Sequence, residues 1–265
     1  MTNHDQPTAS AAPGGGGRVL LEPWVLIYPP GGIGLIWSQK SACTTALLWY
    51  LAHLGLLEAA AAYSRWPHNY RMKVLPENES YKRWVAACDP NRLRWVRVIR
   101  DPCRRAVSSY RHALRFGYEN DAIGRVLGLS VAERGFSFSE FLAYLDRIDV
   151  VSCNPHHSQQ WHAFEAELPA ARVVNADKEP LLDSLCDFAD PGAGARELLA
   201  AEAARIAELH HARRMHSRGH CADVVFQPSN AGGEWPEYEA FLDSQGRSSI
   251  ERIYRVDFEQ FVGVL

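Results

Sequence analysis

The sequence lacks an excess of either charge and lacks paired cysteines. Its 28 Lys and Arg residues stand against 31 Asp and Glu residues, and the net charge of −3 gives no reason to expect nonspecific binding to nucleic acid. The six cysteines are scattered without the spacing of a disulfide framework or a standard zinc pattern. The composition therefore argues against a nucleic-acid partner, a disulfide-stabilised scaffold and a metal site.

The sequence also predicts neither a membrane-spanning segment nor a signal peptide. Residues 46–63 form the most apolar window, but polar residues and a glycine interrupt it, which favours a buried helix. Residues 1–18 have no basic start followed by an apolar stretch, so they predict a disordered tail. We expect a cytoplasmic protein without a membrane anchor, and the sequence leaves its oligomeric state open.

What is present is the composition of one globular domain. With 265 residues, 47% of them hydrophobic and 22% charged, the chain can bury one substantial core, and we expect residues 19–265 to form it. Strand-like and helix-like stretches alternate, which favours an α/β fold with a parallel sheet flanked by helices. The expected strands are 24–28, 33–37, 93–99 and 173–174; the expected helices are 44–63, 80–88, 102–116, one capped by Ser137 or Ser139 that runs to residue 147, 179–188, 195–211 and 248–258, with little pattern in 117–135.

A lysine loop, residues 37–45, follows the second expected strand. It reads Trp-Ser-Gln-Lys-Ser-Ala-Cys-Thr-Thr, and the N-terminus of the next helix points at Lys40. Free backbone N–H groups and the helix dipole favour an anion there, and the lysine adds a positive charge. Gln39 stands where a Walker A motif has glycine, which disfavours a standard ATPase. The loop predicts a phosphate site.

A second anion site is predicted in an arginine motif, residues 100–108. Asp101 is a suitable N-cap and Pro102 a suitable first helical residue, so Arg100 lies at the carboxyl end of the preceding strand while Ser108 projects from the helix. Ligands of open α/β sheets bind outside the carboxyl ends of the strands, so Arg100 and the lysine loop can face one crevice. A planar guanidinium with a hydroxyl suits a second phosphate.

Together the two motifs resemble the signatures of sulfotransferases that use 3′-phosphoadenosine 5′-phosphosulfate (PAPS). The Ala-Cys-Thr of the lysine loop is similar to that of the carbohydrate sulfotransferase group, whose animal members include Golgi enzymes. The histidine segment, residues 154–160 (Asn-Pro-His-His-Ser-Gln-Gln), resembles the central element of that group. The closing segment, residues 253–258 (Ile-Tyr-Arg-Val-Asp-Phe), resembles its last element. The resemblance covers about residues 24–265 and implies a P-loop-like three-layer fold.

The resemblance also implies which residues hold the two phosphate groups of the cofactor. The 3′-phosphate would lie on Arg100 and Ser108, with Arg105 in a supporting role. Arg247 and Ser248 precede the last expected helix, where related enzymes close a loop over the nucleotide, and are assigned to the cofactor. The 5′-phosphosulfate would lie on Lys40, Ser41, Ala42, Cys43, Thr44 and Thr45.

Sulfuryl transfer needs a base for the acceptor hydroxyl and a cation for the leaving oxygen. We assign His156 as the base, because histidine accepts a proton near neutral pH, and Lys40 as the cation. His157, which replaces an aromatic residue of the family pattern, is the rival base, and Gln160 is a candidate to orient acceptor or cofactor. The expected acceptor is a hydroxyl of a carbohydrate or a glycosylated small molecule.

Two other classes of function stay open. A small-molecule kinase would share the phosphate cradle but use ATP and magnesium, and no clear Asp or Glu partner for the metal accompanies Lys40. A nucleotide-binding protein without catalysis would keep Lys40 and Arg100 and would not need His156. The segment 210–221, rich in His and Arg, is interpreted as a solvated or cofactor-covering basic segment.

Overall fold

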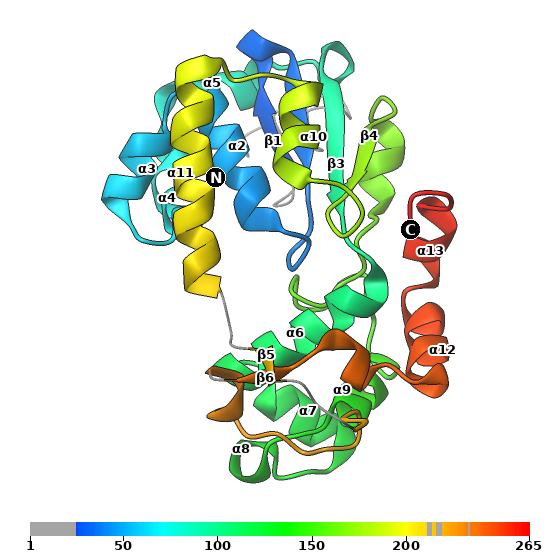
Figure 1. Ribbon diagram of the computed structural model, residues 1–265. Coiled ribbons are helices and arrows are strands. Elements are labelled where there is room, and N and C mark those ends of the chain that lie inside the picture. Colours follow the sequence, from blue (N-terminus) through cyan, green and yellow to red (C-terminus); the bar gives the residue numbers. More distant parts are fainter. Residues whose placement is uncertain (1–24, 211–213, 216–218, 233) are drawn as a thin grey trace, which may run out of the picture.

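A four-stranded sheet forms the upper part of the molecule in Figure 1. The computed structural model describes residues 25–210, 214–215, 219–232 and 234–265, so the expected tail 1–18 and part of the segment 210–221 lie outside the description. Strands β2 to β4 run parallel, whereas β1 is antiparallel to β2. The α/β class is therefore confirmed. The strands follow one another in the sheet in the order β1 (Val25–Tyr28), β2 (Ile33–Ile36), β3 (Arg94–Ile99) and β4 (Arg172–Asn175).

The sheet is mixed, and the expectation of a parallel sheet throughout is wrong at its first strand. β1 and β2 are joined by residues 29–32 alone, which form the short helix η1 (Pro29–Gly31) and end on Gly32 with a left-handed φ of 64°. A parallel pair needs a crossover of about a dozen residues or more, so this short connection returns the chain antiparallel. The three-layer, P-loop-like arrangement stays a prediction.

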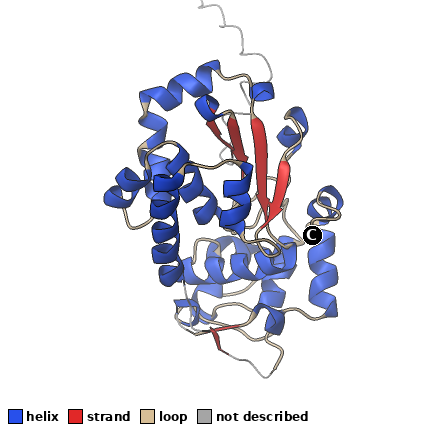
Figure 2. Cartoon of the chain, turned by 45° about the horizontal axis from the view of Figure 1, so that its top comes forward, coloured by secondary structure: helices blue, strands red, loops and turns tan. Residues whose placement is uncertain are grey.

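The two faces of the sheet pack on different helices. On one face, the strands share a core with α2 (Cys43–His53), α10 (Leu181–Phe188) and α11 (Ala193–His210), and α10 and α11 both pack against α2; Figure 2 shows the strands and the helices around them by colour. On the other, α5 (Glu79–Ala87) and η4 (Ala163–Glu167) pack against Val25, Ile27 and Trp95. Side chains alternate along each strand, and Leu26 accordingly belongs to the first core while its two neighbours belong to the second.

The expected long helix over residues 44–63 is broken in two. α2 ends at His53, and three residues separate it from α3 (Leu57–Tyr63), because Gly55 takes a left-handed φ of 65° that ends a helix readily. Next along the chain come α4 (Pro67–Lys73), η2 (Leu75–Glu77) and η3 (Pro90–Arg92).

A second core, made mostly of helices, lies beyond the carboxyl ends of the parallel strands (Figure 1). Tyr110 of α6 is at its centre, in contact with five aromatic rings, and its hydroxyl donates a 2.7 Å hydrogen bond to the carbonyl of Phe136. Of the two proposed caps, Ser137 caps α9, in a capping box with Glu140. The helices of this core are α6 (Pro102–Phe116), α7 (Asn120–Leu127), α8 (Val131–Arg134), α9 (Phe138–Leu145) and α12 (Ser244–Ile253), with η6 (Tyr238–Phe241).

Two stretches of this part differ from the expectation. Residues 117–135, which carry little pattern in the sequence, form α7 and α8, and the last expected helix is two helices, α12 and α13 (Arg255–Gln260). A small strand pair, β5 (Arg214–Met215) with β6 (Trp235–Pro236), and η5 (Asn230–Gly232) complete the description. Among the described helices, none has the length and apolar character needed to cross a bilayer.

Candidate functional site

The lysine loop leads from β2 into α2 with an unusual backbone. Lys40 and Ala42 have positive φ values of 67° and 54°, which non-glycine residues rarely adopt and which store strain at functional loops. α2 begins at Cys43, so the backbone N–H groups of its first turn have no intrahelical acceptor. The predicted strand, turn and helix N-terminus are confirmed, and together they leave donors for an anion.

Two internal contacts hold this loop in place. The Nε–H of Arg105, a residue that is 1% exposed, donates a 2.9 Å hydrogen bond to the carbonyl of Gln39. The fully buried hydroxyl of Ser41 donates a 2.7 Å bond to Oε1 of Gln160. Arg105 therefore supports the lysine loop, whereas the resemblance implied a supporting role at the 3′-phosphate. The Ser41 hydroxyl faces the protein interior, so this residue shapes the loop from behind.

Lys40 itself is half-buried, and within the described part of the chain no carboxylate pairs with its ammonium group. Burial, together with the positive charges of Arg100, Arg111 and Arg105, lowers the pKa of Lys40 to about 8. An unpaired cation held among other cations is stabilised by an incoming anion. The electrostatics of the loop thus suit a phosphate or sulfate group.

Arg100 lies at the carboxyl end of β3, as expected, but it already has partners. Its Nε–H donates to both oxygens of Asp177 at 3.1 Å, and its Nη2 donates to the hydroxyl of Tyr238 at 3.2 Å. Asp101 caps α6 through a 3.0 Å bond from the N–H of Arg104, which confirms the predicted cap. Asp177 fixes the direction of the Arg100 guanidinium and neutralises part of its charge.

Ser108 and the last two assigned cofactor residues lie in different surroundings. Ser108 is half-buried on α6, and its hydroxyl has no hydrogen-bond partner among the described residues, so it is open to a ligand. Arg247 and Ser248 have exposed side chains on α12, and the Arg247 guanidinium lies beside the Cys103 thiol at the start of α6. The structure brings Arg247 to the first turn of α6, and no described contact joins it to the lysine loop.

The remaining residues of the lysine loop face a side chain of α4. Oγ1 of Thr44 lies 3.2 Å from Nε2 of His68, and the thiol of Cys43 lies 3.7 Å from the same nitrogen. Burial raises the pKa of the Cys43 thiol, which keeps it protonated. Thr45 is half-buried on the first turn of α2.

His156 is presented as a neutral imidazole in a defined tautomer. Oδ1 of Asn154 accepts the backbone N–H of His156 at 3.1 Å, which identifies this atom as the amide oxygen, and it lies 3.0 Å from Nδ1 of the His156 ring. Nδ1 therefore carries the proton, and Nε2 keeps its lone pair. Burial, with the charges of Lys40 and Arg105, lowers the pKa of His156 to about 4. The ring is unprotonated at neutral pH.

His157 has a different environment. It is 0% exposed, its ring packs edge-on against Phe141 and Tyr144, and its Nε2 lies 3.6 Å from a carboxylate oxygen of Glu119. The hydroxyl of Tyr254 donates a 2.7 Å bond to the His157 carbonyl, which holds this residue in the core. A substrate hydroxyl can approach His156 far more readily than His157.

Gln160 joins the lysine loop, the arginine motif, the histidine segment and the closing segment, which are the four motifs of the candidate site. Its Oε1 accepts from Ser41 at 2.7 Å and from the backbone N–H of Arg100 at 2.9 Å, while its Nε2 donates to the Arg100 carbonyl at 2.9 Å. Its own backbone N–H donates to both oxygens of Asp257, at 2.7 and 2.9 Å. The carboxylate of Asp257 also accepts the N–H of Trp161 at 2.9 Å. The lysine loop, arginine motif, histidine segment and closing segment therefore meet at one buried residue, through its side chain and its backbone N–H.

Asn154 and His112 of α6 were not predicted as site residues, although His112 stacks on His156 with ring centroids 4.2 Å apart. A signal for Asn154 was present, because an asparagine two residues before a backbone N–H commonly forms an Asx turn. His112 lies seven residues after Arg105, on the same face of the helix, so helical periodicity could have placed it near the site.

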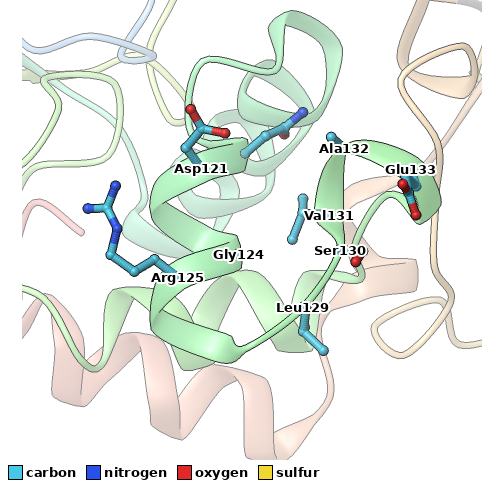
Figure 3. A pocket seen from close by; sticks show the side chains of 9 residues that line it. Asp121, Gly124, Arg125, Leu129, Ser130, Val131, Ala132 and Glu133 are labelled. Carbon is cyan, nitrogen blue, oxygen red and sulfur yellow. The ribbon is translucent and has the colours of Figure 1, made fainter.

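A pocket between α7 and α8 lies apart from these motifs (Figure 3). Asp121, Arg125 and Glu133 are among its lining residues, and none of the lining residues belongs to the four motifs. In the ranges that the structure describes, no three His, Cys, Asp or Glu side chains are grouped so as to hold a metal ion.

Comparisons with known proteins find no match: no protein-family model, no curated sequence and no solved structure is significantly similar to this chain. The resemblance to sulfotransferases therefore depends on the sequence of the four motifs alone.

Proposed function

We propose that this chain is a PAPS-dependent sulfotransferase with a P-loop-like α/β fold, which transfers a sulfuryl group to a hydroxyl of a carbohydrate or a glycosylated small molecule. The observation that carries the proposal is the meeting of a cation and a base. Lys40 has no carboxylate partner among the described residues, and after burial its positive charge contributes to the low pKa of His156. Gln160 holds the segments of both residues together.

The residues of the site fit an adenosine that carries charged groups on both the 5′ and the 3′ oxygen of its ribose. The strained lysine loop, the free N–H groups of α2 and the unpaired Lys40 suit the 5′ end. The open hydroxyl of Ser108 and the guanidinium of Arg100, oriented by Asp177, suit a 3′-phosphate. Once bound, PAPS supplies an activated sulfuryl group on a phosphate leaving group.

The reaction then requires one residue that accepts a proton and one that stabilises negative charge. His156 takes the proton of the acceptor hydroxyl on Nε2, because Asn154 keeps the proton of the neutral ring on Nδ1. Lys40, in its protonated form, stabilises the negative charge that develops on the leaving oxygen. A bound anion raises the pKa of Lys40, so the residue is charged when that charge is needed.

Calorimetric titration with three nucleotides tests this function. Adenosine 3′,5′-bisphosphate should bind at least tenfold more tightly than AMP, since a second charged group contributes about 1.4 kcal/mol or more. Arg100→Ala should remove that preference, and Arg92→Ala, a change at an exposed arginine outside the site, should not. Equal affinity for the bisphosphate and AMP contradicts the 3′-phosphate site. Preference for ATP with magnesium supports the kinase alternative instead.

The rate at which the sulfated product forms separates the catalytic roles of Lys40 and His156. Lys40→Ala should weaken binding of the bisphosphate and, at saturating PAPS, lower kcat by about a hundredfold or more. His156→Ala should lower kcat by roughly two to four orders of magnitude while still binding the bisphosphate. His157→Ala should lose less, because its ring is enclosed in the core. Inactivity of the His157 variant with normal turnover of the His156 variant would show that the base is misassigned.

A further inference from the structure

A group of aromatic rings lies against the candidate base and has no part in the function proposed so far. His112 of α6 is stacked on His156, with ring centroids 4.2 Å apart and ring planes 20° apart. The ring of Phe116 lies 4.6 Å from the His112 ring on the same helix, and Tyr118 contacts both histidines, at 5.4 and 5.5 Å. Phe116 is 59% exposed and Tyr118 is 37% exposed, so this group lies at the surface of the site.

His112 is itself held in position. Its Nδ1 lies 2.9 Å from the hydroxyl of Tyr118. Burial and the nearby charges of Lys40 and Arg115 keep His112 neutral, and burial keeps the phenol of Tyr118 protonated. A protonated phenol is a good donor to a neutral imidazole nitrogen, so the ring plane of His112 is fixed by both the helix and this hydrogen bond.

We propose that His112 is a positioning residue for His156. Asn154 fixes one edge of the His156 ring through Nδ1, but one hydrogen bond leaves the ring free to tilt about that contact. The face-to-face contact with His112 removes this freedom and shields one face of the ring from water. The lone pair of Nε2, which accepts the proton of the substrate hydroxyl, thereby keeps one direction. General-base catalysis depends on this precision, since small displacements of a reacting group lower rates strongly.

This role rests on the proposed function, because it assumes that His156 is the base. The groups that face His156 are Lys40 of the lysine loop, Arg105 and His112 of α6, Tyr118 after α6, and Asn154 and His157 of its own segment. Of these, His112 offers a neutral, flat surface to the ring, so its replacement tests the stacking contact without removing a charge.

The test compares three variants by nitrogen-detected NMR of the histidine rings in the unliganded protein. In the wild type, His156 should show a protonated Nδ1 and titrate well below 6.5. In His112→Ala the pKa of His156 should rise by about one unit or more, because water reaches the exposed face of the ring. His112→Phe keeps the stack and should retain the low value. His53→Ala, at a half-buried histidine against Trp49, is the matched control and should change nothing.

Kinetics and binding complete the experiment. His112→Ala should lower kcat about tenfold or more without changing the affinity for adenosine 3′,5′-bisphosphate, and His112→Phe should restore most of kcat. A Phe variant as inactive as the Ala variant would show that a nitrogen of His112 acts directly, which overturns the positioning role. An unchanged His156 signal in the Ala variant would overturn it as well. Failure of the wild type to bind the bisphosphate would refute the sulfotransferase proposal, while the NMR comparison would still decide whether His112 orients His156.

Discussion

The pH dependence of nucleotide binding gives a direct measure of the charge on Lys40. In the unliganded protein the pKa of this residue is about 8, because burial and then the neighbouring guanidinium groups disfavour its charge. A bound phosphate reverses this effect and favours the protonated form. Only the protonated fraction is competent to bind, and the apparent dissociation constant rises as that fraction falls.

The size of the change in affinity with pH follows from the pKa of Lys40. With a pKa of about 8, roughly nine-tenths of the molecules are protonated at pH 7, half at pH 8 and one-tenth at pH 9. The affinity for adenosine 3′,5′-bisphosphate should therefore fall about tenfold from pH 7 to pH 9, and binding at pH 8 should take up about half a proton. Histidines do not contribute in this range, because those of the site titrate at acidic pH.

Isothermal titration calorimetry in two buffers of different ionisation enthalpy measures both quantities. Lys40→Arg is the matched control, since arginine keeps its charge throughout this range and should give a nearly flat affinity with no proton uptake. A wild-type affinity that does not change between pH 7 and pH 9 would refute the reasoning. So would a tenfold fall that persists in the Lys40→Arg variant, because another group would then be responsible.

Three further predictions concern stability, measured by urea unfolding. Gly34→Ala should destabilise the fold by about 2 kcal/mol or more, because a Cβ there would lie 2.3 Å from the buried Trp95 ring. Gln160→Leu should cost about 3 kcal/mol, since it leaves buried backbone groups and the Ser41 hydroxyl unpaired, and Gln160→Glu, which keeps the acceptor, should cost less. Burial lowers the pKa of His157 to about 3, so only the unfolded chain gains this proton as pH falls from 6.5 to 5. The unfolding free energy should fall by about 1 kcal/mol per pH unit over this range, approaching about 1.4 kcal/mol per unit at its lower end, and His157→Gln should remove that part of the slope.

Local signals in the sequence predicted much of the fold around the site. The Asp-Pro pair at residues 101–102 predicted where α6 begins, and the carboxyl-end rule for parallel strands predicted that the lysine loop and Arg100 lie at one edge of the sheet. The antiparallel β1 was also within reach, because the length of its connection to β2 is visible in the sequence. These features depend on neighbouring residues or on chain length, which a single sequence contains.

Contacts between distant segments could not be predicted in the same way. Asp177 lies 77 residues from Arg100, and nothing in the local pattern of either residue indicates that they pair. The stacking of His112 on His156 depends on how α6 packs against the histidine segment. The two histidines of that segment carry the same side chain, and only burial distinguishes the accessible ring from the enclosed one.

The residues of the four motifs divide into two groups according to what their polar atoms contact. Among the residues that the structure describes, the first group has no hydrogen-bond or ion-pair partner for its functional atom, and it includes Lys40, Ser108 and Nε2 of His156. The polar atoms of the second group form hydrogen bonds within the protein, as those of Ser41 and Gln160 do. A buried polar group that loses its partner is costly, so the hydrogen bonds of Gln160 favour one arrangement of the segments that they join. The hydrogen bonds of Gln160 thus explain how residues more than a hundred positions apart are held in one site. Substitutions in the second group should therefore lower the stability of the fold, whereas substitutions in the first group should change ligand affinity and turnover.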